Sequence, residues 1–141
     1  MTNQMSAMSY IDKLTLILVW NRRQIVAQTQ GKSVFFTPGG KREPGESDRD
    51  ALCREVREEL GGVDLIPSTI RAYGTFEAQA FGKPAGTRVR MTCYAAECDG
   101  AIEPSAEVEE LCWIRSDFSY DLLSVTGIMI LEDLKAQDII N

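Results

Sequence analysis

Residues 39–62 read GGKREPGESDRDALCREVREELGG, a polar loop followed by a charged helix. The Pro-Gly pair at 44–45 interrupts regular structure and predicts the loop. Ser47 or Asp48 is suited to cap the helix N-terminus, and a glycine pair ends the helix after about Leu60. The segment is therefore predicted to form a loop, a helix and a second turn.

Three glutamates lie on one side of this helix. With about 100° of rotation per residue, Glu55, Glu58 and Glu59 fall in one narrow sector. An adjoining apolar stripe, predicted to face the core, comprises Leu52, Val56 and Leu60. Like charges at this spacing repel, and acidic groups near a helix C-terminus oppose the helix dipole. Two unfavourable features on one turn indicate that the protein uses these carboxylates.

A hard divalent cation would compensate the three charges. Mg²⁺ prefers oxygen ligands, keeps several waters and bridges carboxylates to phosphates. Arg54 precedes Glu58 by four residues and is placed to orient and neutralise that carboxylate. Gly39 and Gly40 leave backbone groups open to a ligand. The alternative is an ordinary solvated helix face stabilised by Glu–Arg pairs.

The spacing across the segment resembles the signature of the Nudix hydrolase family, G-x5-E-x7-R-E-U-x-E-E-x-G-U, in which U is apolar. Its fixed positions are occupied by Gly40, Glu46, Arg54, Glu55, Glu58, Glu59 and Gly61, and its inner apolar position by Val56. The last apolar position departs from the pattern, because it holds Gly62 with Val63 directly after it. This departure affects how the chain leaves the helix and touches no proposed ligand.

The resemblance implies a fold and a set of site residues. The expected fold is an α/β/α sandwich with a mixed β-sheet. The metal ligands are expected to be Gly40, through its carbonyl (with Gly39 as the alternative), Glu55, Glu58, Glu59 and Glu107. The residues expected to serve catalysis are Glu46, Arg54, Glu58 and Glu59, of which Glu46 and Arg54 hold the loop–helix–loop geometry. Glu107 is chosen from the acidic segment that also contains Glu103, Glu109 and Glu110, and this segment equally fits a plain solvated turn.

The rest of the chain predicts further strands and a second helix. Strands are expected over 14–20, 24–30, 34–37, 70–80, 87–97, 101–103 and 111–114, and a helix over 122–137. Pro38 and the following glycine pair are expected to end the third strand. Asp99-Gly100 predicts a hairpin turn, and an acidic loop is expected over 104–110. No repeat or composition shift divides residues 1–141, so one α/β domain is predicted, with 1–9 as a candidate disordered segment.

Composition narrows the partners. A chain of 141 residues, 44% of them hydrophobic and 26% charged, fits one soluble domain. The formal net charge of −6 argues against binding to polymeric DNA or RNA, and the apolar runs are too short to cross a membrane. The chain has no histidine, which excludes Ser-His-Asp triads, Cys-His dyads and zinc sites that need imidazole.

The four cysteines and the N-terminus indicate a cellular location. No two cysteines have the C-x-x-C spacing, and all four are expected to be reduced thiols. The N-terminus lacks the basic start and long apolar stretch of a secretory signal. The protein is therefore expected in the cytoplasm. It is also expected to be a monomer or a homodimer.

Together, the residues and the resemblance predict a Mg²⁺-dependent hydrolase, with Mn²⁺ as a substitute, that cleaves a pyrophosphate bond in a small nucleotide. The preferred substrate is a (deoxy)nucleoside triphosphate, cleaved to a monophosphate and pyrophosphate. Many triphosphate-cleaving relatives have an arginine where this chain has Gln28-Thr29-Gln30, so oxidised guanine nucleotides are not singled out. The alternatives are a nucleotide-sugar or dinucleotide diphosphatase, and a catalytically silent nucleotide-binding regulatory module.

Overall fold

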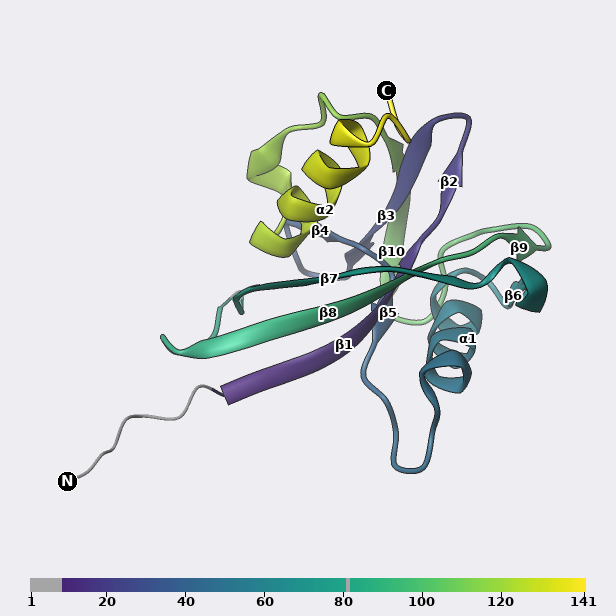
Figure 1. Ribbon diagram of the computed structural model, residues 1–141, viewed down its shortest axis with the longest axis horizontal. Helices are drawn as coiled ribbons and strands as arrows, with labels where there is room; N and C mark the ends of the chain where they lie inside the picture. The colour runs from purple at the N-terminus through teal and green to yellow at the C-terminus, as the bar shows by residue number, and fades with distance from the viewer. Residues whose placement is uncertain (1–8, 81) are drawn as a thin grey trace.

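The computed structural model describes residues 9–80 and 82–141, which form ten strands, two α-helices and two short 3-10 helices (Figure 1). The strands are β1 (Ser9–Ile17), β2 (Val19–Trp20), β3 (Arg23–Thr29), β4 (Phe35–Phe36), β5 (Gly39–Gly40), β6 (Asp64–Leu65), β7 (Arg71–Gln79), β8 (Thr87–Ala95), β9 (Cys98–Asp99) and β10 (Val108–Ile114). The helices are α1 (Asp48–Glu59) and α2 (Val125–Ala136), with the 3-10 helices η1 (Pro67–Thr69) and η2 (Tyr120–Leu122).

The strands form two larger sheets and one small one. The first sheet has the order β5-β1-β8-β7, the second has the order β10-β3-β2 with β4 also paired to β3, and the third pairs β6 with β9. In the first sheet β1 and β8 run parallel, whereas β5 and β7 are antiparallel to their neighbours. The predicted mixed sheet is confirmed.

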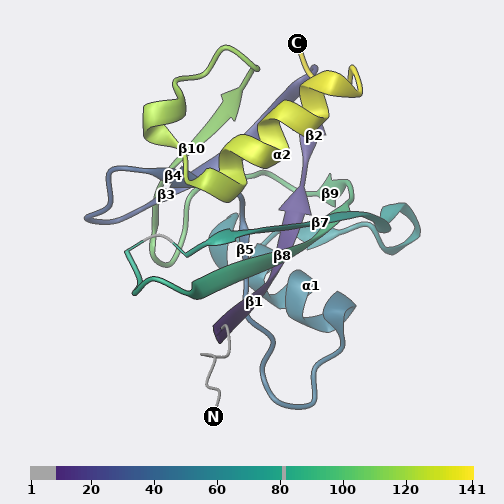
Figure 2. The same ribbon diagram turned by 60° about the vertical axis from the view of Figure 1, so that its left-hand side comes forward.

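The side chains of β1 alternate between two hydrophobic cores, as the period of a strand requires. Leu14 and Leu16 pack in the core beneath α1, whereas Ile17 packs in the core beneath α2. The predicted apolar stripe of α1 is fully buried: Leu52, Val56 and Leu60 each have 0% exposure. Figures 1 and 2 show the two helices on opposite sides of the β7–β8–β1 sheet. This arrangement is the predicted α/β/α sandwich.

Both helices begin at serine caps. The Ser47 hydroxyl accepts a 3.1 Å hydrogen bond from the Asp50 amide at the start of α1, as predicted. The Ser124 hydroxyl accepts a 3.2 Å bond from the Gly127 amide, so α2 begins at Val125, later than predicted. In the described part of the chain, neither helix is long and apolar enough to span a bilayer. All four cysteines are free, as predicted.

Three expectations about strands are wrong. The strand before Pro38 ends at Phe36, as expected, but the glycine pair at 39–40 does not interrupt strand pairing, because it forms β5 against Leu14 and Thr15 of β1. Asp99-Gly100 does not open a hairpin, because β9 pairs with β6 and residues 101–103 lie outside any strand. β10 starts at Val108, inside the predicted acidic loop, where it pairs with β3.

The first strand also differs from its prediction. β1 starts at Ser9, before the predicted 14, and Leu18 separates it from β2. The expected disorder over 1–9 is therefore wrong at Ser9, and residues 1–8 lie outside the described residues.

Candidate active site

The two glycines of β5 allow the sheet to touch the acidic side of α1. A Cβ atom on Gly40 would lie 2.4 Å from the Glu55 carboxyl carbon, so no other residue fits there without displacing that carboxylate. Gly39 has φ +148°, and a Cβ atom there would lie 1.9 Å from the Leu14 carbonyl oxygen. The Gly39 amide donates a 2.9 Å hydrogen bond to Oε1 of Glu59. Because neither residue of β5 has a side chain, this strand can lie directly against the carboxylates of Glu55 and Glu59.

Arg54 connects the loop to the acidic face of α1. Its guanidinium donates to both carboxylate oxygens of Glu46, at 2.7 and 2.8 Å, and to Oε1 of Glu55 at 2.9 Å. It also donates to the Lys41 carbonyl at 3.0 Å and lies 3.6 Å from Oε1 of Glu58. This forked contact with Glu46 uses a geometry that lysine lacks. The predicted Arg54–Glu58 ion pair is present, but the arginine's shortest contacts are with Glu46 and Glu55.

The Glu46 carboxylate is held in its charged form. Hydrogen bonds from Arg54, and a further one from the Glu43 amide at 2.7 Å, lower the pKa of Glu46 to about 2. Because a carboxylate that stays charged keeps Arg54 fixed, this pair fixes the loop against the helix.

Glu55 and Glu59 have the opposite electrostatic environment. The pKa of Glu59 is raised to about 8, mainly by burial and also by the neighbouring charges of Glu55 and Glu58, although the hydrogen bond from the Gly39 amide opposes this shift. Burial also raises the pKa of Glu55, whose side chain is only 16% exposed, although Arg54 opposes this shift. Glu58 is half exposed, at 52%. A buried carboxylate with a raised pKa gains most from a nearby cation.

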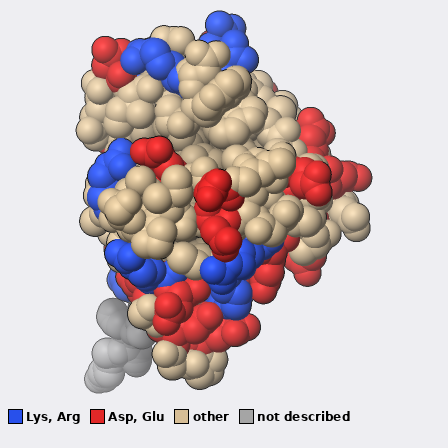
Figure 3. All heavy atoms as spheres, turned by 90° about the vertical axis from the view of Figure 1, so that its right-hand side faces the viewer, with Lys and Arg blue, Asp and Glu red and all other residues tan. Residues whose placement is uncertain are grey.

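A cavity of about 360 Å³ lies over these side chains. Its lining residues are Glu43, Arg54, Glu55, Glu58, Glu59, Ala106 and Glu107. The structure therefore brings Glu107 to the same cavity as the helix carboxylates, and it does not bring Glu103, Glu109 or Glu110 to its lining. Figure 3 shows the side of the molecule on which α1 lies in Figure 1, where acidic and basic side chains intermingle towards the bottom.

The segment before Glu107 is fixed to the end of α1. The Glu103 amide donates to the Leu60 carbonyl and the Ser105 amide to the Glu59 carbonyl, both at 3.3 Å, while the Ser105 hydroxyl donates to the Glu58 carbonyl. These bonds satisfy carbonyls that the helix end leaves without partners. A Cβ atom on Gly61 would lie 2.5 Å from Cγ of Glu103, so this close approach depends on glycine.

Several residues of the site were missed by sequence reasoning. Ser105 and Glu43 carry no local signal, because their roles depend on the packing of separate segments. Lys13 on β1 lies in the field of Glu55 and Glu59, and burial lowers its pKa, with Lys41 adding to the shift.

The departure from the motif at Gly62 has a structural explanation. Gly62 turns the chain with φ +85°, and Val63 is buried at 3% exposure in the core that packs against α1.

The donor set fits a divalent cation that arrives with a phosphate. Within residues 9–80 and 82–141, no three acidic or cysteine side chains converge closely enough to hold an ion by themselves. Mg²⁺ is commonly held by one or two carboxylates together with substrate phosphates and waters. Glu55 and Glu59, half-buried beside the backbone of β5, supply carboxylates of this kind.

Comparisons with known proteins agree with the fold and the motif. The NUDIX domain family matches residues 11–118. An uncharacterized Nudix hydrolase of Bacillus subtilis, YvcI, is 34% identical over 70 residues, which are 49% of this chain and 44% of that protein. The match thus spans less than half of the relative's length.

Solved structures show the same fold. A MutT NUDIX hydrolase from Burkholderia pseudomallei superposes with a TM-score of 0.74 at 21% identity, over 88% of this chain and 97% of the other. The E. coli ORF135 protein gives 0.72 at 24% identity, over 93% and 92%. The E. coli dihydroneopterin triphosphate pyrophosphohydrolase gives 0.69 at 18% identity, over 89% and 95%. With the domain match over most of the sequence, these findings show that the chain belongs to the Nudix family.

Proposed function

We propose that this chain is a Nudix-type pyrophosphohydrolase that uses Mg²⁺, with Mn²⁺ as a substitute, to cleave a pyrophosphate bond in a nucleoside diphosphate-linked substrate. The observation that carries the proposal is the contact of Glu55 and Glu59 with the glycine pair of β5. Two carboxylates are kept half-buried there, although burial raises the pKa of both. Such an arrangement costs stability, and a bound cation would recover it.

The residues of the site have distinct proposed roles. Glu55, Glu59 and the Gly40 carbonyl would hold the cation, with Glu58 beside them and Glu107 in the lining of the same cavity. Bound Mg²⁺ would neutralise the diphosphate and lower the pKa of a coordinated water. Glu46 keeps Arg54 oriented through two hydrogen bonds, and Arg54 in turn fixes Oε1 of Glu55. One of the cavity carboxylates accepts the proton of the attacking water, because the chain has no histidine for this step.

The preferred substrate is a (deoxy)nucleoside triphosphate, cleaved to a monophosphate and pyrophosphate. Support comes from the fold shared with an E. coli enzyme that acts on dihydroneopterin triphosphate. A nucleotide-sugar or dinucleotide diphosphatase and a silent nucleotide-binding regulatory module remain the alternatives.

A cytoplasmic location is proposed as well, because the four free cysteines suit a reducing compartment. The oligomeric state, a monomer or a homodimer, stays a prediction.

Hydrolysis of a nucleotide panel tests the proposal. Phosphate and pyrophosphate release would be measured with Mg²⁺, with Mn²⁺ and with a chelator, for the wild type, Glu59→Gln and the control Glu109→Gln. Glu109 is exposed on β10 and does not line the cavity. The proposal expects metal-dependent release that Glu59→Gln abolishes and Glu109→Gln retains. Equal activity of Glu59→Gln and wild type would contradict the mechanism, and inactivity on every substrate would favour the silent module.

A further inference from the structure

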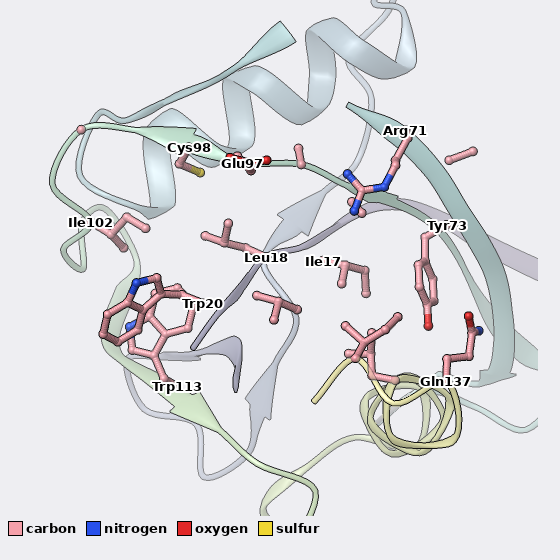
Figure 4. Close-up of a pocket in the computed structure, with 17 residues that line it drawn as sticks. Ile17, Leu18, Trp20, Arg71, Tyr73, Glu97, Cys98, Ile102, Trp113 and Gln137 are labelled. Atoms are coloured by element: carbon pink, nitrogen blue, oxygen red, sulfur yellow. The ribbon is translucent and has the colours of Figure 1, made fainter. Parts of the chain in front are cut away.

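A second cavity, larger than the one over the carboxylates, lies away from the acidic site. It has a volume of about 880 Å³ and shares no lining residue with the carboxylate cavity. Its walls come from the end of β1, β2, the start of β7, the end of β8 and β10, and the C-terminal end of α2 closes one side (Figure 4). Sites for small ligands typically measure about 300–1,000 Å³. This cavity therefore has the size of a ligand site and is separate from the proposed catalytic residues.

Two tryptophans form one wall of this cavity. The ring centroids of Trp20 and Trp113 lie 5.8 Å apart with a tilt of 57°, and Trp20 is 64% exposed. Ile17 and Leu18 form an apolar floor beside them (Figure 4). An exposed indole next to an apolar floor presents a flat surface on which another ring can stack. Because exposing so much indole to water is unfavourable, a planar ligand would gain by covering it.

The hairpin that presents Trp20 is held in place from outside the cavity. Asn21 and Arg22 turn it with φ +52° and +57°. The Arg22 guanidinium donates to the side chains of Asn141 at 2.7 Å and Asp138 at 2.6 Å, and the Asn141 amide donates to the Arg22 carbonyl at 3.1 Å. The C-terminal residues therefore fix the hairpin tip, and a ligand would meet a preformed wall.

Arg71 brings a positive charge to the opposite wall. Figure 4 shows its guanidinium reaching from β7 towards the space between Leu18 and Tyr73. It donates a 3.2 Å hydrogen bond to the Thr69 carbonyl, and no acidic side chain of the described residues lies within ion-pair distance of it. A guanidinium whose one side-chain bond is to a carbonyl keeps free donors for an anion.

We propose that this cavity is a second ligand site, which binds a planar heterocycle bearing an anionic group, with the dimensions of a mononucleotide. The ring stacks on Trp20 and Trp113, and the anionic group binds Arg71. The site is independent of the proposed hydrolysis, because none of its residues lines the carboxylate cavity.

The only two tryptophans of the chain both line this cavity, so intrinsic fluorescence reports its occupancy directly. Nucleoside monophosphates would be titrated in the presence of a metal chelator, with excitation at the red edge of indole absorption, where nucleotide bases absorb little. Unphosphorylated nucleosides and inorganic phosphate serve as comparison probes. The proposal expects saturable quenching by at least one monophosphate, and binding weaker by about tenfold for the matching nucleoside, because a charge-assisted contact is lost.

Variants assign the contacts. Arg71→Ala is expected to weaken monophosphate binding about tenfold and to leave nucleoside binding unchanged. Arg49→Ala, which removes an exposed arginine on α1 outside the cavity, is expected to change neither. Trp20→Ala keeps Trp113 as the fluorescent reporter and is expected to weaken the binding of both the monophosphate and the nucleoside.

Each result decides the proposal. Lack of saturable quenching by any monophosphate up to about 10 mM, the weakest binding of interest, would overturn it. Equal binding of nucleosides and monophosphates, or an unchanged affinity in Arg71→Ala, would also overturn it. Hydrolysis by the same protein plays no part in this readout, so loss of the proposed enzyme activity leaves the test intact.

Discussion

The backbone amide of Gly39 donates a hydrogen bond of 2.9 Å to Oε1 of Glu59, joining the edge strand β5 to the acidic face of α1. The next residue, Gly40, leaves space for the Glu55 carboxylate that a Cβ atom would fill. The glycine pair therefore performs two tasks, since one residue binds a carboxylate and the other makes room for its neighbour. This relationship leads to separate predictions for the two glycines.

Gly40→Ala is expected to reduce hydrolysis by about 100-fold with little loss of stability, because only the flexible end of Glu55 must move. Gly39→Ala is expected to unfold more easily, by about 2–4 kcal/mol, since its Cβ atom meets the backbone of Leu14. Thermal melts and steady-state rates separate the two effects. Gly74→Ala is the matched control on β7, where the nearest atom to the new Cβ is 3.8 Å away. Equal stability of the Gly39 and Gly40 variants would contradict this account.

The raised pKa of Glu59 predicts how stability depends on pH without metal. In the folded protein this pKa is about 8, against 4.5 in the unfolded chain, so the folded state binds more protons between these values. The free energy of unfolding should therefore fall as pH rises from 5 to 8, by at most about 1.4 kcal/mol per pH unit. Denaturant titrations in a chelator measure this slope. Glu59→Gln should flatten it, and an unchanged slope in that variant would assign the effect to other groups.

The same pKa predicts that metal binding releases protons near neutral pH. A Glu59 that is partly protonated at pH 7 must lose its proton to become a ligand. Calorimetric titration with Mg²⁺ and a non-hydrolysable nucleotide, in buffers of different ionisation enthalpy, counts the protons released. The number should decline as pH approaches 9, where the carboxylate is already charged. Identical heats in all buffers would show that Glu59 does not bind the ion.

Arg54 and Arg57 offer a matched pair on one helix. Arg54 makes a forked contact with Glu46, whereas Arg57 makes an exposed ion pair with Asp64 at 2.6 Å. Arg54→Lys should lower kcat by at least about tenfold, because a lysine cannot hold both Glu46 and Glu55. Arg57→Lys should leave kcat unchanged, since exposed ion pairs contribute little. Equal effects of the two substitutions on kcat would exclude a positioning role for Arg54.

The local sequence predicts α1 well because its signals are local. Ser47 caps its start, and Leu52, Val56 and Leu60 follow the helical period and are all buried. The pairing of β9 with β6 was not predictable in the same way, because β6 lies before the β7–β8 hairpin in the sequence. A turn dipeptide such as Asp99-Gly100 indicates a change of direction and carries no information about a distant partner strand.

The glycine pair shows a second limit of sequence reasoning. Two adjacent glycines usually interrupt a strand, yet here their lack of side chains allows β5 to pair with β1 and touch α1. The propensity of a residue describes an average environment, and close tertiary approach overrides it. The helix carboxylates followed from their spacing on one element, whereas Ser105 and Lys13 became part of the site through packing between elements.

Glu107 tests the part of the site that lies outside the helix. It follows Ala106, which turns the backbone with φ +55°. The carbonyl of Glu107 accepts a 3.0 Å hydrogen bond from the Gln30 amide, so the backbone on this side of the cavity is fixed. Glu107→Gln should lower kcat by about 100-fold with unchanged stability, because its side chain lines the cavity and is exposed to solvent. Glu109→Gln removes the same charge two residues later and should remain active, since Glu109 does not line the cavity. Rates and melting temperatures of both variants test this role. Equal rates of the two variants would show that the acidic segment is an ordinary solvated turn. A loss of activity confined to Glu107→Gln would show that Glu107 takes part in the reaction.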